Sequence, residues 1–251
     1  MKELTKQQAH RIFKIHQKAH KCIKDYELIQ DGDKLLIGLS GGKDSLALVE
    51  ILGEKMKVFH PKFSVIAAHI SVENIPYKAD LNYLNDYCMQ FNIPFIHAST
   101  SFDSDTDHRK SPCFLCSWNR RKKLFETAKA NGCNKIALGH HQDDILETLL
   151  MNMCFQGAIG TMPPYLKMNK FDMTIIRPLS LHTEKEMTEL AEIRKFPQQS
   201  KNCPFEKDSH RASVKSLLQQ LEKLNPRVKN SLWSSMTNIQ SEYLPKELKN
   251  K

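Results

Sequence analysis

A continuously apolar run that ends in a glycine pair constrains the fold of this chain more than any other feature. Residues 35–39 read Leu-Leu-Ile-Gly-Leu, and residues 40–45 read Ser-Gly-Gly-Lys-Asp-Ser. A strand buried on both faces of a parallel sheet is apolar throughout. Two glycines allow the backbone to turn tightly and to direct N–H groups at an anion near the start of the next helix. The run therefore predicts a strand, a phosphate-binding loop and a helix.

The spacing of the glycines excludes two common nucleotide loops. Walker A requires G-x-x-x-x-G-K-[ST] and the dinucleotide fingerprint requires G-x-G-x-x-G, and neither fits Gly38, Gly41 and Gly42. Ser-Gly-Gly-Lys-Asp-Ser instead resembles the signature of the PP-loop ATP pyrophosphatases, which cleave ATP between its α and β phosphates to adenylate a substrate. The resemblance implies an ATP site whose pyrophosphate is held by Ser40, Gly41, Gly42 and Ser45, neutralised by Lys43, and accompanied by a Mg²⁺ ion positioned by Asp44.

The rest of the chain alternates strand and helix patterns, which predicts a doubly wound, mostly parallel α/β sheet. The resemblance implies that this sheet is of the PP-loop, adenine nucleotide alpha hydrolase-like type. A loop is expected over 156–172, and capping boxes are expected at Thr5 with Gln8 and at Thr183 with Glu186. We expect a basic N-terminal helix (1–30) and a PP-loop domain (31–200) that includes the helix with Cys113 and Cys116. A C-terminal cysteine loop and helical tail (201–251) are expected to pack on the same domain. Strands are expected at 63–70, 94–98, 134–138 and 174–176, and helices at 5–29, 46–57, 79–91, 112–130, from 142 to near 157, at 209–224 and at 227–239.

Two further segments are expected at the carboxyl edge of the sheet, where ligands bind in such folds. His69 and Ile70 end the second strand, and the resemblance makes them a wall for adenine. A second strand-to-helix turn contains Gly139 and His140 beside ATP, with Asp143 and Asp144 as working carboxylates. Decoration of a helix N-terminus is the plainer explanation for the two aspartates.

Three of the seven cysteines lie outside apolar segments: Cys113, Cys116 and Cys203. A single C-x-x-C is compatible with a redox pair, half of a zinc site or a partial cluster ligand set. His108 or His210 could complete a Cys₃His zinc site. Three cysteines can also hold an iron–sulfur cubane while one iron stays open for another ligand.

The glycine loop, Pro-Cys113-x-x-Cys116 before a basic helix, Gly139-His140-x-x-Asp143-Asp144 and the late Cys203-Pro together resemble the TtcA-like tRNA 2-thiocytidine synthetase family. The resemblance implies a cytosolic enzyme that adenylates C2 of an anticodon-loop cytidine, at position 32, and replaces its oxygen with sulfur from a cysteine desulfurase or another donor. Cys113, Cys116 and Cys203 would bind a 4Fe-4S cluster. The catalytic residues would be Asp144, Asp143, Arg120, which lies one helical turn after Cys116, and Lys43.

A formal charge of +9 favours a polyanionic partner, with tRNA as the leading candidate. A charged helix face is ordinarily a solvated one, whereas a basic stripe can also follow a phosphate backbone. No run approaches the roughly 20 apolar residues that span a bilayer, so no membrane partner is expected. Basic residues at both chain ends are compatible with a homodimer. The RNA-binding candidates are Arg11, Lys14, Lys18, Lys21, Arg121 and Lys122.

Two other functions compete with sulfur transfer. A PP-loop ligase such as a lysidine synthetase would let an amine attack the activated base, and it would need no cysteine triad. A zinc-stabilised, basic RNA-binding module that only senses ATP would need no paired carboxylates.

Overall fold

The computed structural model describes residues 4–58, 60–75, 79–102, 112–168, 172–198 and 210–245. The chain divides into two compact units. The larger unit contains Met1–Ile145 and Met162–Asp208, and the smaller contains Leu146–Thr161 and Ser209–Lys251. Each unit is described by itself below.

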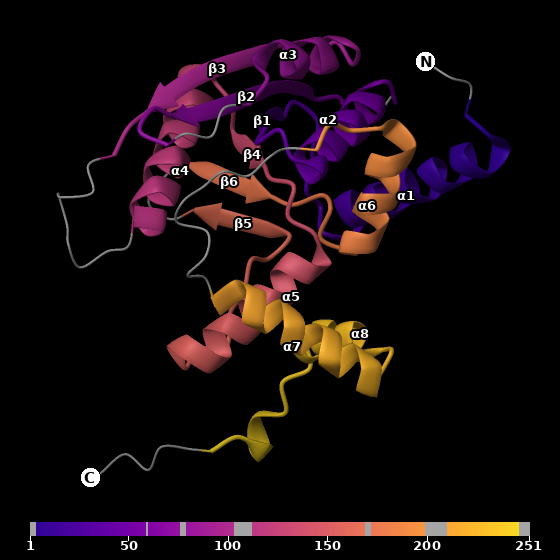
Figure 1. The fold of residues 1–251 in the computed structure, drawn as a ribbon, viewed down its shortest axis with the longest axis vertical. Helices are drawn as coiled ribbons and strands as arrows, with labels where there is room; N and C mark the ends of the chain where they lie inside the picture. The colour runs from indigo at the N-terminus through magenta and orange to yellow at the C-terminus, as the bar shows by residue number, and fades with distance from the viewer. Residues whose placement is uncertain are drawn as a thin grey trace. The chain divides into compact units, whose positions relative to one another are not determined.

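The larger unit is built on a six-stranded sheet with the order β3-β2-β1-β4-β6-β5 (Figure 1). Five strands are parallel, and β5 pairs with β6 in antiparallel orientation. Leu36 pairs with Ile66 of β2 on one side and with Ile136 of β4 on the other, so β1 lies in the middle of the sheet. The strands are β1 (Lys34–Gly38), β2 (Ser64–Val72), β3 (Phe95–Thr100), β4 (Lys135–Ala137), β5 (Tyr165–Met168) and β6 (Met173–Ile176).

Successive residues of β1 serve two different cores, because side chains alternate across a strand. Leu35 and Ile37 face a core shared with four helices, and Leu36 faces a second core shared with one helix. The result is a three-layer unit with helices on both faces of the sheet, as the alternating pattern predicts (Figure 1). The first face carries α1 (Lys6–Asp25), α2 (Lys43–Met56), α3 (Leu81–Met89) and α6 (Glu184–Arg194), and the second carries α4 (Pro112–Ala130).

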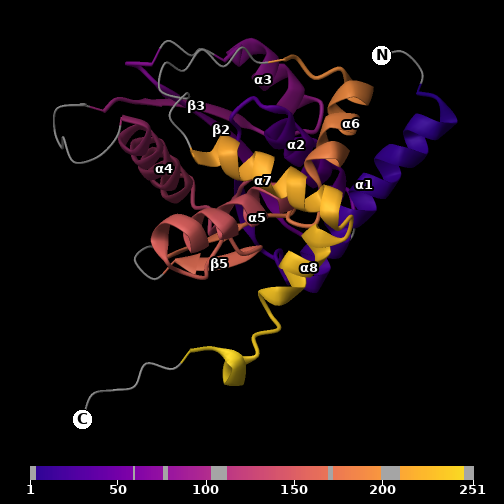
Figure 2. The ribbon, with the colours of Figure 1, turned by 60° about the horizontal axis from the view of Figure 1, so that its bottom comes forward.

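The smaller unit is helical. It begins inside α5 (Gln142–Met151), which continues as a π-helical turn, η1 (Asn152–Gln156). Its α7 (His210–Leu224) and α8 (Val228–Ser235) are adjacent in both views, and a short 3₁₀ turn, η3 (Ser241–Tyr243), follows (Figures 1 and 2). A small apolar cluster holds the unit together, and its buried members are Leu146, Leu150, Val214 and Leu218.

Several local predictions are confirmed. Capping boxes begin α1 at Thr5 with Gln8 and α6 at Thr183 with Glu186. The predicted bounds of α4 match the structure. The first helix, however, ends at Asp25 rather than at residue 29, because the chain turns through a left-handed residue at Glu27, whose φ is 48°.

The predicted loop over 156–172 is wrong in part, because it contains the edge strand β5. The prolines at 163 and 164 and the glycine at 160 dominate the pattern there, and they conceal a short alternation of exposed Tyr165 and Lys167 with half-buried Leu166 and Met168. Such alternation is typical of an edge strand. The predicted helix from 142 to near 157 is α-helical only to Met151.

Among the described residues, no helix is both long enough and apolar enough to cross a lipid bilayer.

Candidate functional site

The site forms where the strand order reverses. The chain leaves β1 for β2 on one side, whereas β4 lies on the other side of β1. In open α/β sheets, ligands bind at the carboxyl edge beside such a switch point. Both predicted strand-to-helix turns, β1–α2 and β4–α5, open at this edge.

Gly139 brings the two turns into contact. A Cβ placed on Gly139 would lie 3.0 Å from the carbonyl carbon and oxygen of Asp44 and 3.1 Å from the backbone nitrogen of Ser45. Backbone atoms cannot swing aside as a flexible side chain can, so this position strongly favours glycine. The close approach joins the β4–α5 turn to the start of α2.

Two serines shape the glycine loop. Gly41 adopts a left-handed conformation with φ of 88°, which glycine adopts at no steric cost. The Gly41 N–H donates to Ser45 Oγ (3.1 Å), and the Gly42 N–H donates to Ser40 Oγ (3.2 Å). Ser45 Oγ donates to the Gly42 carbonyl (2.9 Å), so Ser40 supplies the proton for the 3.1 Å contact between the two hydroxyls. Ser40 and Ser45 therefore hold the loop that the sequence singles out.

The loop leads into the N-terminus of a 14-residue helix. Gly42 is the N-cap of α2, and no side chain of the described residues caps it. The first turn of a helix has N–H groups without intrahelical partners and carries the positive end of the helix dipole. This N-terminus has the polarity and the donors that a phosphate group requires.

Lys43 and Asp44 form a charged pair at the same helix start. The Lys43 ammonium lies 3.3 Å from each oxygen of the Asp44 carboxylate. Burial raises the pKa of Asp44, and the charge of Asp144 raises it further, whereas Lys43 and His141 oppose the shift. Among the described residues, the buried Oδ1 of Asp44 has no partner in hydrogen-bond geometry. A carboxylate oxygen in this state fits a divalent cation, since Mg²⁺ takes one or two carboxylates together with water and phosphate oxygens.

Asp143 and Asp144 cap helices. The His141 backbone N–H donates to Asp144 Oδ2 (3.0 Å) at the start of α5. The Glu184 backbone N–H donates to Asp143 Oδ2 (2.7 Å) at the start of α6. The Asp143 side chain is 8% exposed, whereas the Asp144 side chain is 20% exposed. Asp144 is therefore the more accessible carboxylate, and its charge also acts on Asp44.

His69 and Ile70 lie at the end of β2, both buried. His69 Nδ1–H donates to the Leu39 carbonyl just before the glycine loop (2.8 Å), which fixes the ring beside that loop. Burial lowers the pKa of His69, and the nearby charges of Arg120 and His97 lower it too. A buried neutral imidazole held by a backbone carbonyl fits the predicted wall. The same electrostatic effect indicates that Arg120 of α4 lies near this end of β2.

Arg177 contacts the second turn through His140, although no sequence motif includes it. It follows β6 and is 4% exposed. Its Nε donates to His140 Nδ1 (3.2 Å) and its Nη1 donates to the Pro163 carbonyl (2.6 Å). Burial lowers the pKa of Arg177 to about 10, with a smaller effect from Arg121. Because arginine only donates, His140 Nδ1 must accept, so a neutral His140 carries its proton on Nε2. The one sequence feature that could have indicated Arg177 is its position directly after an apolar strand.

The predicted cluster ligands are only partly described. Cys113 is exposed and Cys116 is half-buried, both in the first turns of α4, and Cys203 lies outside the described residues. Burial raises the pKa of Cys22 and of Cys88 to about 12, which keeps them as inert thiols. Within the described part of the chain, no three His, Cys, Asp or Glu side chains are grouped to hold a metal ion. Two accessible thiols one turn apart fit two ligands of a thiolate-bound cluster.

The basic stripe of α1 is largely paired. Arg11 contacts Glu189 (2.5 Å) and Lys18 contacts Glu186 (2.7 Å), both on α6. Lys21 pairs with Asp25 in its own helix. Lys14 has no ion pair among the described residues, and Arg121 and Lys122 of α4 are exposed.

Glu147, four positions after Asp143 in α5, forms an ion pair within the smaller unit. Its carboxylate is 4% exposed and accepts from Arg211 Nε of α7 (3.0 Å).

Comparison with known proteins agrees with this geometry. The fold and the glycine loop define the PP-loop class of ATP-binding domains, and the model of the PP-loop domain family matches residues 11–220. A "tRNA-cytidine(32) 2-sulfurtransferase" of Nitrosospira multiformis is 36% identical over 96% of this chain and 83% of its own length. Another of that name, from Aliivibrio fischeri, is 34% identical over 97% of this chain and 82% of its own length. This chain therefore belongs to the tRNA-cytidine(32) 2-sulfurtransferase family.

A solved structure of a related enzyme has the same fold. The U34-tRNA thiolase NcsA from Methanococcus maripaludis, solved with its 4Fe-4S cluster, aligns with a TM-score of 0.78 at 26% identity. The alignment covers 96% of this chain and 83% of that one.

Proposed function

We propose that this protein is an ATP-dependent sulfurtransferase that converts a tRNA cytidine, at position 32 of the anticodon loop, to 2-thiocytidine. The observation that carries the proposal is the contact of Gly139 with Asp44 and Ser45, which joins two nucleotide-binding turns in one site. ATP is the substrate that makes the C2 oxygen of the base a leaving group, because that oxygen departs readily only as part of AMP.

The residues of the glycine loop bind the phosphates of ATP. The uncapped start of α2 faces the β and γ phosphates with its first-turn N–H groups, and Lys43 neutralises the charge that develops on pyrophosphate. Asp44 holds Mg²⁺ through its Oδ1, which accepts no hydrogen bond from the described residues. Ser40 and Ser45 keep the loop in shape, Gly139 allows the second turn to approach, and His69 with Ile70 forms the adenine wall.

The second turn acts on the reacting end of ATP. His140, held by Arg177, directs its Nε2–H into the site, where it donates to a phosphate oxygen. Asp144 takes the proton or assists the cation, since it is the more exposed of the two aspartates and its charge acts on Asp44. Asp143 supports the geometry by joining α5 to the start of α6.

Cys113, Cys116 and Cys203 hold a 4Fe-4S cluster in this proposal. When bound, such a cluster supplies an iron with an open coordination position that can carry sulfur. The exposure of Cys113 leaves its thiolate accessible for ligation. Arg120 contacts a phosphate of the RNA or the activated base. A cysteine desulfurase or another donor delivers the sulfur.

The tRNA contacts α4 through Arg121 and Lys122, with α1 as a second basic surface. Lys14 is the unpaired cation of the α1 stripe among the described residues, whereas Arg11, Lys18 and Lys21 would exchange their carboxylate partners for phosphates. We propose a cytosolic enzyme that acts without a membrane partner, either alone or as a homodimer.

Each of the two competing functions leaves a feature of the structure without a role. A lysidine synthetase has no use for two accessible thiols at the start of α4 beside a basic helix face. A module that only senses ATP needs no second turn packed against the glycine loop. Neither alternative is favoured by a specific contact.

Mass spectrometry of nucleosides from tRNA tests the proposal. A deletion strain should lack 2-thiocytidine, and the wild-type gene should restore it, whereas genes encoding Asp44→Asn or Cys113→Ser should not. Unchanged 2-thiocytidine in the deletion strain would refute the function. Anaerobic purification with absorption and Mössbauer spectra tests the cofactor, since a colourless, zinc-loaded and fully active protein would refute the cluster.

A further inference from the structure

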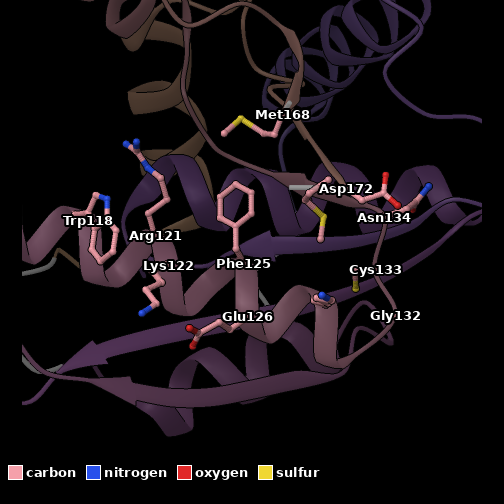
Figure 3. Close-up of a pocket in the computed structure, with 12 residues that line it drawn as sticks. Trp118, Arg121, Lys122, Phe125, Glu126, Gly132, Cys133, Asn134, Met168 and Asp172 are labelled. Atoms are coloured by element: carbon pink, nitrogen blue, oxygen red, sulfur yellow. The ribbon is translucent and has the colours of Figure 1, made fainter. Parts of the chain in front are cut away.

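A groove along α4 lies in the larger unit and contains none of the residues assigned to ATP or the cluster. It encloses about 810 Å³, within the roughly 300–1,000 Å³ of small-ligand pockets. One wall is a face of α4, with Trp118, Arg121, Phe125 and Lys129 at helical spacing. The opposite wall comes from Met168 at the end of β5 and from the start of β6. Figure 3 shows Phe125 in the middle of the groove with Met168 across from it.

The groove combines an apolar floor with a basic rim. Phe125, Cys133 and Met173 are buried residues of the second core, and they form apolar surface below the opening. Arg121, Lys122 and Lys129 stand exposed around it. The acidic lining residues are Glu126, which lies 4.0 Å from Lys123, and Asp172. Cations therefore outnumber acids at the rim, on a chain of formal charge +9.

The exposed ring of Trp118 indicates which class of ligand the groove binds. Its surface is 51% exposed, which is unusual for so large an apolar side chain. The Lys122 ammonium lies over the indole, 5.6 Å from the ring centroid. An exposed aromatic ring beside a cation is the arrangement by which proteins stack an unpaired base and contact its phosphate. Trp118 and Arg121 lie toward the same end of the groove (Figure 3).

We propose that this groove binds an unstacked nucleotide of the tRNA that flanks the modified base, with its base on Trp118 and its backbone phosphates near Arg121, Lys122 and Lys129. The inference rests on the proposed function, because it takes tRNA as the substrate. The helix α4 ends at Ala130, shortly before β4 begins at Lys135, so Trp118 and Arg121 lie toward the opposite, carboxyl edge of the sheet, where the ATP site is placed. The electrostatic effect of Arg121 on the pKa of Arg177 agrees with this placement. A nucleotide in the groove would anchor the single-stranded loop while the target base enters the site.

Affinity for tRNA is the first test. Trp118→Ala should weaken binding of an unmodified tRNA transcript roughly 5- to 100-fold, the loss typical of one stacked base, and Trp118→Phe should retain most of the affinity. Tyr243→Ala removes another exposed aromatic side chain, 80% exposed in the smaller unit and assigned to no site, and should bind as the wild type does. Thermal unfolding of each variant verifies that it is folded. Equal affinity of Trp118→Ala and wild type would overturn the inference.

Salt dependence tests the basic rim. Lys129→Gln should lower the slope of log affinity against log salt concentration by about one, as expected for one lost phosphate contact. Lys185→Gln, at an exposed lysine of α6, is the matched control and should leave the slope unchanged. An unchanged slope for Lys129→Gln would exclude that phosphate contact.

Fluorescence tests stacking directly. The chain has two tryptophans, so Trp233→Phe leaves Trp118 as the single emitter. An anticodon stem-loop RNA should quench this emission in a saturable way, and unlabelled tRNA should compete. Binding of the RNA without quenching would overturn the inference. If the emission of Trp118 falls as the protein concentration rises, without RNA, the inference would also be overturned. That result would assign the groove to a second copy of this chain.

The same experiments separate this inference from the proposed function. If Trp118→Ala binds and thiolates tRNA as the wild type does, the groove inference fails and the sulfurtransferase stands. If the deletion strain keeps its 2-thiocytidine, the sulfurtransferase fails, whatever the emission of Trp118 shows.

Discussion

The backbone of Asp44 occupies the space that a side chain at Gly139 would need. Any Cβ at Gly139 would be 3.0 Å from two backbone atoms of Asp44, a distance that real Cβ atoms rarely reach. Gly139 belongs to the turn after β4, and Asp44 belongs to the first turn of α2, which follows β1. This contact determines how the phosphate loop and the second turn share one site.

Gly139→Ala should impair nucleotide chemistry more than stability. The added methyl group pushes the second turn away from α2, and overpacking of this kind costs about 1–3 kcal/mol of unfolding free energy. Displacement of the loop should reduce ATP-dependent pyrophosphate release at least about tenfold, since small misplacements of reacting groups are costly. Gly160→Ala, where the new Cβ meets nothing within 4 Å, is the control. Full activity of a folded Gly139→Ala protein would show that the contact does not position the loop.

Asp44→Asn should make the protein more stable while abolishing adenylation. Burial raises the pKa of Asp44, so the folded protein binds the proton more tightly than the unfolded chain does. The ionised carboxylate therefore costs stability. This cost begins as the pH rises through the unfolded pKa and is fully present above the folded pKa. Asparagine keeps the shape without the charge, and the gain should disappear at strongly acidic pH.

Thermal unfolding across a pH series, without nucleotide and with a chelator, measures this difference. Addition of Mg²⁺ with a non-hydrolysable ATP analogue should then stabilise the wild type more than Asp44→Asn. Equal stabilisation of both proteins would separate Asp44 from the cation.

The sequence predicted the parts of this site that depend on local chemistry. An apolar run before a glycine pair, two capping boxes and the bounds of α4 need only neighbouring residues, and all are present in the structure. The alternation of strands and helices also predicted a mostly parallel sheet, because parallel strands require crossover helices. The order of the strands depends on long-range pairing and was not predicted.

Contacts between residues that are far apart in the sequence could not be predicted in this way. Arg177 gains its role from His140 and from the Pro163 carbonyl, which lie 37 and 14 positions earlier. Asp143 accepts from the backbone of Glu184, which is 41 positions later. No periodicity in one sequence reports such contacts. The strand β5 was missed because adjacent prolines suggested a loop.

Arg177→Lys tests whether the guanidinium positions His140. A lysine ammonium has no planar fork, so it cannot donate to both His140 Nδ1 and the Pro163 carbonyl in the same geometry. One buried acceptor then loses its donor, which costs about 1–3 kcal/mol of unfolding free energy. A positioning role also predicts that the KM for ATP rises and kcat falls, which a purely structural defect in the remaining folded enzyme would not cause. Arg227→Lys, at an exposed arginine, should change neither. Unchanged kinetics in a destabilised Arg177→Lys enzyme would leave Arg177 a structural role only.

Alkylation should separate the cysteines by their surroundings. Iodoacetamide reacts with thiolates, and a pKa of about 12 leaves Cys22 and Cys88 almost entirely protonated near neutral pH. The exposed Cys113 and Cys154 should therefore be modified first in the metal-free protein, as peptide mass spectrometry would report. Reconstitution with iron and sulfide under anaerobic conditions should protect Cys113 and Cys116, because their thiolates become ligands. Cys154, which no proposed site includes, should stay reactive. Equal labelling of Cys113 and Cys154 in the reconstituted protein would remove Cys113 from the ligand set.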